Sequence, residues 1–161
     1  MISPRPAAPQ IRLASGADLD LLAGLYGQAF GEPYTRPAVE TLLAAAGAWA
    51  LVAECDRTPC GFIIARVAAD EAEILSLGVA PPARRAGVGG ALLDAAIACV
   101  KVANARRLFL EVGEDNPAAQ SLYRRAGFAT VGRRPDYYKR ADGSHVDALI
   151  MRIAVKNSGC D

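Results

Sequence analysis

A short segment rich in glycine and arginine could bind a phosphate group. It reads Arg84-Arg85-Ala86-Gly87-Val88-Gly89-Gly90 and stands between an apolar run at 71–79 and a helical pattern at 87–103. A helix N-terminus presents free N–H groups and a partial positive charge, and glycines let a phosphate approach the backbone closely. A tight strand-to-helix turn would use the same glycines only for their conformational freedom. The residue types alone leave both interpretations open.

Two common phosphate-binding motifs do not describe this segment. The P-loop needs a lysine followed by Ser or Thr after its last glycine, and the dinucleotide fingerprint needs G-x-G-x-x-G at the start of a helix. The segment carries neither pattern, and has instead the spacing Arg84-x-x-Gly87-x-Gly89.

One carboxylate, Glu111, stands in an otherwise apolar run at 108–112. A carboxylate buried in such a strand would need a reason, and general acid–base chemistry would supply one. Strand alternation offers another interpretation, because Leu108, Leu110 and Val112 facing inward would turn Phe109 and Glu111 to a common outer face. Taken alone, the alternation favours this second interpretation.

The elements that would position these residues follow from hydrophobic periodicity and from glycine and proline signals. Strands are expected at 11–13, 49–54, 61–67, 71–79, 108–112, 129–131 and 146–153, and helices at 18–29, 37–46, 87–103 and 116–127. Asn116 is expected to cap the last helix, with proline at its first position. Hairpins early in the chain and β-α-β crossovers later predict a mixed α/β fold. The expected organisation is one domain over 11–155 between a flexible start (1–10) and a flexible tail (156–161).

Composition limits the possible functions. The chain has 161 residues and a formal net charge of +1, so no global field would recruit nucleic acid or an anionic membrane. Its apolar stretches fall short of the ~20 residues that a membrane span needs, and the proline-rich start does not resemble a secretory signal. A cytoplasmic protein is therefore expected. The four cysteines, Cys55, Cys60, Cys99 and Cys160, are expected to be free thiols, and a metal site is not expected.

The glycine segment and the second half of the chain resemble the GNAT superfamily of N-acetyltransferases. Arg84-x-x-Gly87-x-Gly89 is similar to the family signature that holds the pyrophosphate of acetyl-CoA. Leu110-Glu111-Val112, followed by Asn116 and by Leu122-Tyr123-Arg124-Arg125-Ala126-Gly127-Phe128, resembles the family's second half. The resemblance implies a mixed, mostly antiparallel sheet of about seven strands, splayed between strands 4 and 5 and flanked by about four helices. It also implies acetyl-CoA as co-substrate and no metal.

Within the superfamily the sequence is most similar to the RimI type, which acetylates the N-terminal alanine of a ribosomal protein. That resemblance implies Glu111 as the general base and Tyr123 as the acid that protonates the departing thiolate. The residues that it implies for acetyl-CoA binding are Leu77, Gly78, Val79, Arg84, Arg85, Ala86, Gly87, Val88, Gly89, Gly90, Asn116 and Tyr123. Tyr34, Tyr137 and Tyr138 are expected to contact the acceptor.

The implied acceptor is the N-terminal α-amine of a protein, with a small-subunit ribosomal protein beginning with Ala as the leading candidate. Pro33-Tyr34 stands where the RimI type usually has Pro-Trp, in a loop that shapes the acceptor site. Two alternatives stay open: acetylation of a small-molecule amine or a lysine side chain, and a non-catalytic acyl-CoA-binding module. No direct binding of nucleic acid or membrane is expected.

Overall fold

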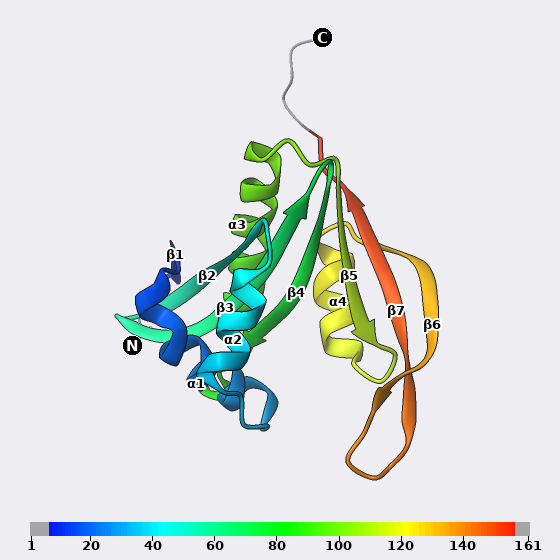
Figure 1. The fold of residues 1–161 in the computed structure, drawn as a ribbon, viewed down its shortest axis with the longest axis horizontal. Helices are drawn as coiled ribbons and strands as arrows, with labels where there is room; N and C mark the ends of the chain where they lie inside the picture. The colour runs from blue at the N-terminus through cyan, green and yellow to red at the C-terminus, as the bar shows by residue number, and fades with distance from the viewer. Residues whose placement is uncertain (1–6, 157–161) are drawn as a thin grey trace, which may run out of the picture.

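The computed structural model of the chain describes residues 7–156, and within that range a single seven-stranded sheet forms its centre (Figure 1). The strands are β1 (Gln10–Leu13), β2 (Ala48–Cys55), β3 (Thr58–Ala68), β4 (Glu71–Val79), β5 (Arg107–Gly113), β6 (Ala129–Lys139) and β7 (His145–Ala154). Their order across the sheet is β1-β2-β3-β4-β5-β7-β6. Among the described strands, only β4 and β5 pair in parallel.

Four α-helices in the described range cover the two faces of this sheet: α1 (Leu19–Phe30), α2 (Arg36–Ala44), α3 (Val88–Val102) and α4 (Pro117–Arg125). The helices α1 and α2 pack on one face, where Leu22 and Val39 are buried with Phe62 of β3. The helices α3 and α4 pack on the other face, where Leu92 is buried with Leu110 of β5. This architecture confirms the predicted mixed, mostly antiparallel sheet with about four helices.

The sheet is splayed between β4 and β5, as predicted. The two strands pair only at Glu71–Arg107, Ala72–Leu108 and Glu73–Phe109 and then diverge (Figure 1). Beyond Glu73, β4 keeps its pairing with β3 on its other side, and β5 keeps its pairing with β7. The edges of β4 and β5 that face each other are therefore available to an extended ligand that carries amide groups.

Gly78 allows α1 to lie close against β4. A Cβ atom at this position would come within 2.8 Å of the Ala29 Cβ and 2.7 Å of a ring carbon of Phe62. Such distances are much shorter than normal van der Waals contact, so any larger residue would push α1 away from the strand. Gly78, which the family resemblance implies for acetyl-CoA binding, therefore also allows the close packing of α1 on β4.

The sequence prediction for β6 was too short. The strand was expected at 129–131 and runs to Lys139, with an irregularity in its pairing with β7 between Arg134 and Tyr138. Pro135 has no N–H to donate to a strand partner. Asp136 has a left-handed φ of 52°, and its N–H donates to the Asp147 carboxylate at 2.9 Å. Tyr137 and Tyr138 therefore lie on an irregular continuation of this strand, beyond the end at 131 that the sequence suggested.

The expected flexible ends coincide in part with residues 1–6 and 157–161, which lie outside the described residues. Among the helices of residues 7–156, none is long and apolar enough to cross a membrane.

Candidate active site

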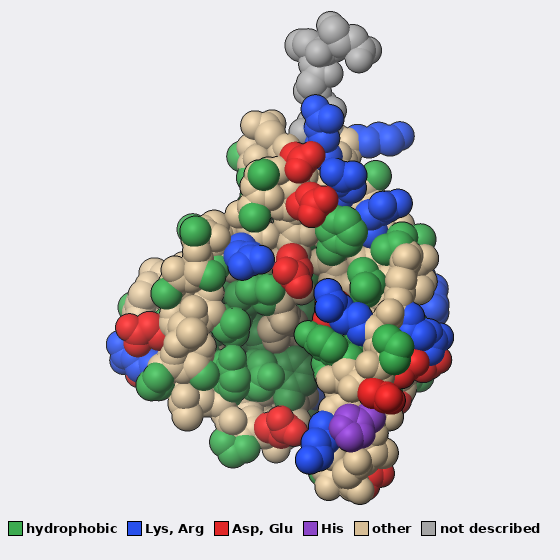
Figure 2. Space-filling view, turned by 45° about the vertical axis from the view of Figure 1, so that its right-hand side comes forward, with side chains coloured by type: hydrophobic (Ala, Val, Ile, Leu, Met, Phe, Trp, Pro, Cys, Tyr) green, Lys and Arg blue, Asp and Glu red, His purple; other side chains and the backbone are tan. Residues whose placement is uncertain are grey.

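The divergence of β4 and β5 opens a cleft of about 470 Å³. Its walls come from α1, β4, β5, the start of α4 and the end of β6, and they include Tyr26, Leu77, Glu111, Tyr123 and Tyr138. Figure 2 shows a hollow on this side of the molecule, with hydrophobic side chains on its floor and charged groups around its rim. Segments far apart in the sequence thus meet at the splay.

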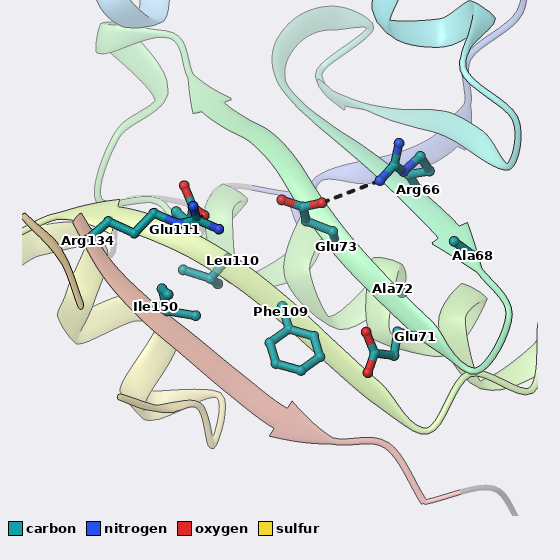
Figure 3. A pocket seen from close by; sticks show the side chains of 10 residues that line it. All are labelled: Arg66, Ala68, Glu71, Ala72, Glu73, Phe109, Leu110, Glu111, Arg134 and Ile150. Carbon is teal, nitrogen blue, oxygen red and sulfur yellow. Dashed lines mark ion pairs between the residues drawn. The ribbon is translucent and has the colours of Figure 1, made fainter. Parts of the chain in front are cut away.

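Glu111 lies on β5 with its side chain on the face opposite α3 and α4. Leu108, Leu110 and Val112 turn into the core on the helix side, so the alternation predicted from the sequence is present. The Glu111 side chain is 19% exposed, and its Oε1 lies 2.7 Å from Nε of Arg134 on β6 (Figure 3). Within residues 7–156 no helix covers Glu111 on this face, because α1 and α2 pack over β2 to β4.

Tyr137 also contacts Glu111. A hydrogen bond to the Glu111 carboxylate is the main cause that raises the pKa of the Tyr137 phenol above its usual value. The guanidinium of Arg134 lies 5.7 Å from the centre of the Tyr137 ring. Glu111 is therefore shielded by one cation and one phenol that both come from β6.

A smaller cavity of about 240 Å³ adjoins the cleft and shares Leu110 and Glu111 with it. Figure 3 shows the ion pair between Arg66 and Glu73, whose charged atoms lie 3.8 Å apart, on the β3–β4 side of this cavity, and Phe109 and Ile150 on the side of β5 and β7. Glu111 stands where the two spaces meet, so a ligand in the cleft can pass its carboxylate and continue over β5.

Tyr123 faces the cleft from the opposite face of the sheet. It projects from α4, is 7% exposed and packs edge-on against Phe128 with ring centres 5.7 Å apart. Burial, followed by the nearby Tyr138, raises the pKa of Tyr123 to about 12. A phenol with this pKa keeps its proton at neutral pH and can donate it. The splay thus places a carboxylate and a protonated phenol on opposite sides of one cleft.

The glycine and arginine segment forms the N-terminus of α3. Gly87, with a left-handed φ of 81°, precedes the helix, and Arg85 also has a positive φ, 63°. A Cβ atom built at Gly87 or Gly90 would meet nothing within 4 Å, so the space above the first turn is open. The N–H groups of a first turn have no partner within their own helix. The geometry suits the anion site that the sequence suggested.

Arg84, which is expected to contact the cofactor, also makes two hydrogen bonds within the chain. Its guanidinium donates to the carbonyl of Ala29 at 2.6 Å and to that of Val79 at 3.2 Å. The side chain therefore ties the end of α1 to the end of β4. The sequence could not show this, because Ala29 lies 55 residues away.

Of the other residues predicted to bind the cofactor, some line the cleft and others lie next to it or in the core. Leu77 and Asn116 line the cleft, and the Asn116 Oδ1 also caps α4 by accepting from the Ala119 N–H at 3.1 Å. Val79 ends β4 beside the glycine and arginine segment. Ala86 and Val88 flank Gly87, with Ala86 exposed and Val88 buried in the core. Gly89 faces Leu122, whose Cδ2 would lie 3.2 Å from an added Cβ.

The predicted acceptor residues do not all reach the cleft. Tyr138 lines it, whereas Tyr137 is 51% exposed. Tyr34 is not among its lining residues within 7–156 and stacks on Tyr26 at 3.9 Å between ring centres. Residues that the sequence analysis missed, Tyr26, Phe30, Glu32 and Ser76, line the cleft. The i, i+4 spacing of Tyr26 and Phe30 was the signal in the sequence for an aromatic helix end.

Ion pairs hold the β6–β7 hairpin against the loop before α4. The Arg140 Nε donates to the Asp115 carboxylate at 2.8 Å, and the pair packs over Gly113, where an added Cβ would lie 2.6 Å from Asp115. Arg133 bridges Glu114 at 2.8 Å and Asp147 at 3.0 Å. These pairs connect the hairpin that carries Tyr138 to the loop that precedes Asn116.

Comparison with known proteins finds acetyltransferases by sequence and by structure. The sequence profile described as Acetyltransferase (GNAT) family matches residues 19–128. A Bacillus subtilis protein provisionally named a ribosomal protein bS18-alanine N-acetyltransferase is 32% identical over 139 residues, or 86% of this chain and 90% of that protein. The Salmonella typhimurium protein named for the same activity is 36% identical over 100 residues, or 62% and 67% of the two chains. The crystal structure of the Escherichia coli ribosomal-protein-S18-alanine N-acetyltransferase matches with a TM-score of 0.86 at 27% identity, covering 94% and 97%.

Proposed function

The chain belongs to the GNAT family of acetyltransferases, and on that premise we propose that it acetylates the N-terminal α-amine of a protein. Acetyl-CoA is the co-substrate of this family. The observation that carries the proposal is the placement of Glu111 and Tyr123 on opposite sides of one cleft. The names of the relatives support the N-terminal alanine of ribosomal protein bS18 as the acceptor. An acceptor that belongs to the ribosome would place the reaction in the cytoplasm.

Three places in and near the splay between β4 and β5 suit acetyl-CoA. The open first turn of α3 at Gly87 and Gly90 suits its pyrophosphate. The unpaired edge of β4 beyond Glu73 suits its amide-containing arm. The cavity between Glu111 and Tyr123 leaves room for its thioester end. When bound, acetyl-CoA supplies the acetyl group as an activated thioester.

The side chains would divide the proton transfers between them. The attacking amine must lose a proton. Within residues 7–156 two carboxylates line the cleft, Glu32 and Glu111, and Glu111 on β5 is the one that the family resemblance assigns as the base, acting directly or through one water. The departing thiolate must gain a proton. Of the three phenols in the described range that line the cleft, Tyr123 is the one that the family resemblance assigns as the acid, and burial keeps it protonated by raising its pKa to about 12. Tyr26, Phe30 and Tyr138 would surround the first residue of the acceptor.

An N-terminal α-amine needs less help from a general base than a lysine side chain does, because more of it is already neutral at pH 7. With a pKa of about 8, roughly a tenth of an α-amine is neutral at pH 7, compared with about 0.04% of a lysine with a pKa of about 10.4. A single half-shielded glutamate is therefore better matched to an N-terminus.

The acceptor is tested with peptides that begin with Ala and contain several lysines. We expect acetylation of the α-amine, located by fragment mass spectrometry, and no turnover once that amine is blocked by formylation. Acetylation of lysine with the N-terminus untouched would assign a lysine acetyltransferase. Polyamines that outcompete every peptide would assign a small-molecule acetyltransferase, and bound acetyl-CoA without any turnover would assign a non-catalytic module.

The phosphate site is tested at Gly90, where a side chain has room and the backbone has no positive φ. Gly90→Asp is expected to weaken acetyl-CoA binding at least about tenfold, since two like charges about 4 Å apart repel by roughly 4 kcal/mol near a protein surface. The fold should persist, because an acidic residue in the first turn stabilises a helix.

Gly90→Asn is the matched control, with the same shape and no charge. Calorimetry should give Gly90→Asn an affinity close to that of the original chain. Equal affinities for the Asp and Asn variants would place the pyrophosphate elsewhere.

A further inference from the structure

Two cysteines that the acetyl-transfer site does not use lie in contact at the β2–β3 hairpin. The Sγ atoms of Cys55 and Cys60 are 2.7 Å apart, and both cysteines are free thiols. The two residues of the turn, Asp56 and Arg57, have left-handed φ values of 48° and 65°, which suit a tight two-residue hairpin. The contact between the two thiols thus follows from the hairpin, because Cys55 ends β2 and Cys60 lies near the start of β3.

An irregularity in strand pairing places both thiols on the same face. Ala53 pairs with Gly61 and Glu54 pairs with Pro59, so Cys60 is an extra residue on β3. Such a bulge redirects a side chain. The Cys60 side chain turns into the core formed with α3, and Cys55 packs at the edge of the same cluster.

A cavity gives small molecules access to this pair. It has a volume of about 340 Å³, and both cysteines line it together with Ala80, Pro82, Ala83 and Ala86. Cys55 is partly exposed, whereas Cys60 is only 4% exposed. Burial, followed by the contact with Cys55, raises the pKa of Cys60 to about 12. Cys55 is therefore the thiol that a reagent meets first, and Cys60 is the one behind it.

We propose that Cys55 and Cys60 are an oxidation site for hydrogen peroxide, and that they close reversibly to a disulfide. The Cys55 thiolate attacks one peroxide oxygen and the O–O bond breaks, which leaves a sulfenic acid and a hydroxide that takes a proton to become water. The Cys60 sulfur then attacks the Cys55 sulfur. The S–O bond breaks, and the hydroxyl leaves with the Cys60 proton as a second water. Two thiols are oxidised by two electrons and one peroxide is reduced.

The second step needs little movement. A disulfide has an S–S length of about 2.0 Å, so the two sulfur atoms at 2.7 Å have to approach by about 0.7 Å. The hairpin already holds them together, so closure is intramolecular and outruns further oxidation. Cys99, exposed on α3, does not share this cavity.

The proposal is tested on the full chain, reduced and then treated with hydrogen peroxide at low molar excess. After alkylation in denaturant and digestion with trypsin, which cleaves after Arg57, the peptides that carry Cys55 and Cys60 should be joined by a disulfide. The linked pair should weigh about 2 Da less than the two free peptides together, and dithiothreitol should separate them.

Two single variants assign the order of the steps. Cys60→Ser should leave Cys55 without a partner, so that this residue accumulates oxygen adducts of about 16 and 32 Da. Cys55→Ser should leave Cys60 largely unoxidised at the same dose, because Cys60 is buried. If the original chain instead accumulates these adducts at Cys55, or links to a second chain, the intramolecular site is wrong. The result does not depend on the acceptor of the acetyltransferase.

Discussion

Replacing Glu111 with Gln is expected to lower kcat for acetyl transfer by about 10²–10⁴-fold, while acetyl-CoA affinity changes little. The amide keeps the shape of the side chain but cannot accept the amine proton. Steady-state kinetics with an Ala peptide, together with calorimetry for acetyl-CoA, would measure the two quantities separately.

Arg134→Gln is the matched control for that experiment. Both substitutions remove the 2.7 Å ion pair between β5 and β6, but only one of them removes the carboxylate. Because the Arg134 side chain is 55% exposed, the pair itself contributes little to stability. We expect Arg134→Gln to keep most of the turnover. If Glu111→Gln keeps the kcat of the unsubstituted chain from about pH 6 to about pH 9, Glu111 has only a structural role. The same conclusion follows if the two variants lose kcat equally.

Tyr123→Phe is the second substitution with a large expected effect, a fall in kcat within the same range of about 10²–10⁴-fold. Phenylalanine preserves the edge-on contact with Phe128, so the fold of α4 should be retained. What is lost is the proton donor for the departing thiolate. Rapid-quench measurement of a single turnover would locate the loss in the chemical step.

The pH dependence of Tyr123 has a definite sign. Its acid form is the active one, and its pKa is raised to about 12, so the fraction that carries a proton stays near one from about pH 6 to about pH 10. The ratio of the original rate to the Tyr123→Phe rate should therefore be constant over that interval. A ratio that collapses above about pH 9 would mean that Tyr123 titrates there, which would contradict the effect of its burial.

The proposed chemistry depends on a defect in the sheet. Continuous pairing of β4 with β5 would close the cleft and consume the backbone groups along both edges, but pairing ends after Glu73 and Phe109. Side chains from opposite faces of the sheet, Glu111 and Tyr123, then line one space. The ion pair between Asp115 and Arg140 holds the far wall in place.

Much of this arrangement was predictable from the sequence, because periodicity reports whether a side chain is buried. The alternation at 108–112 predicted that Glu111 shares a face with Phe109, and the cap at Asn116 predicted the start of α4. The seven strands and four α-helices within residues 7–156 agree in order and type with the prediction. The resemblance to the GNAT family named the fold and the reaction class from local motifs.

Which residues meet across the fold was decided only by the tertiary structure. Arg134 pairs with Glu111, and Arg84 binds the carbonyl of Ala29. Tyr26, and not Tyr34, lines the cleft wall. These contacts depend on the splay of the sheet and on strand register. The contact of Cys55 with Cys60 depends on one extra residue in β3. The local sequence shows which face of each helix or strand is apolar, because the spacing of apolar residues along the element places them on one buried face. The partner on the other side is set by register, and a shift of one residue in register turns a side chain to the opposite face.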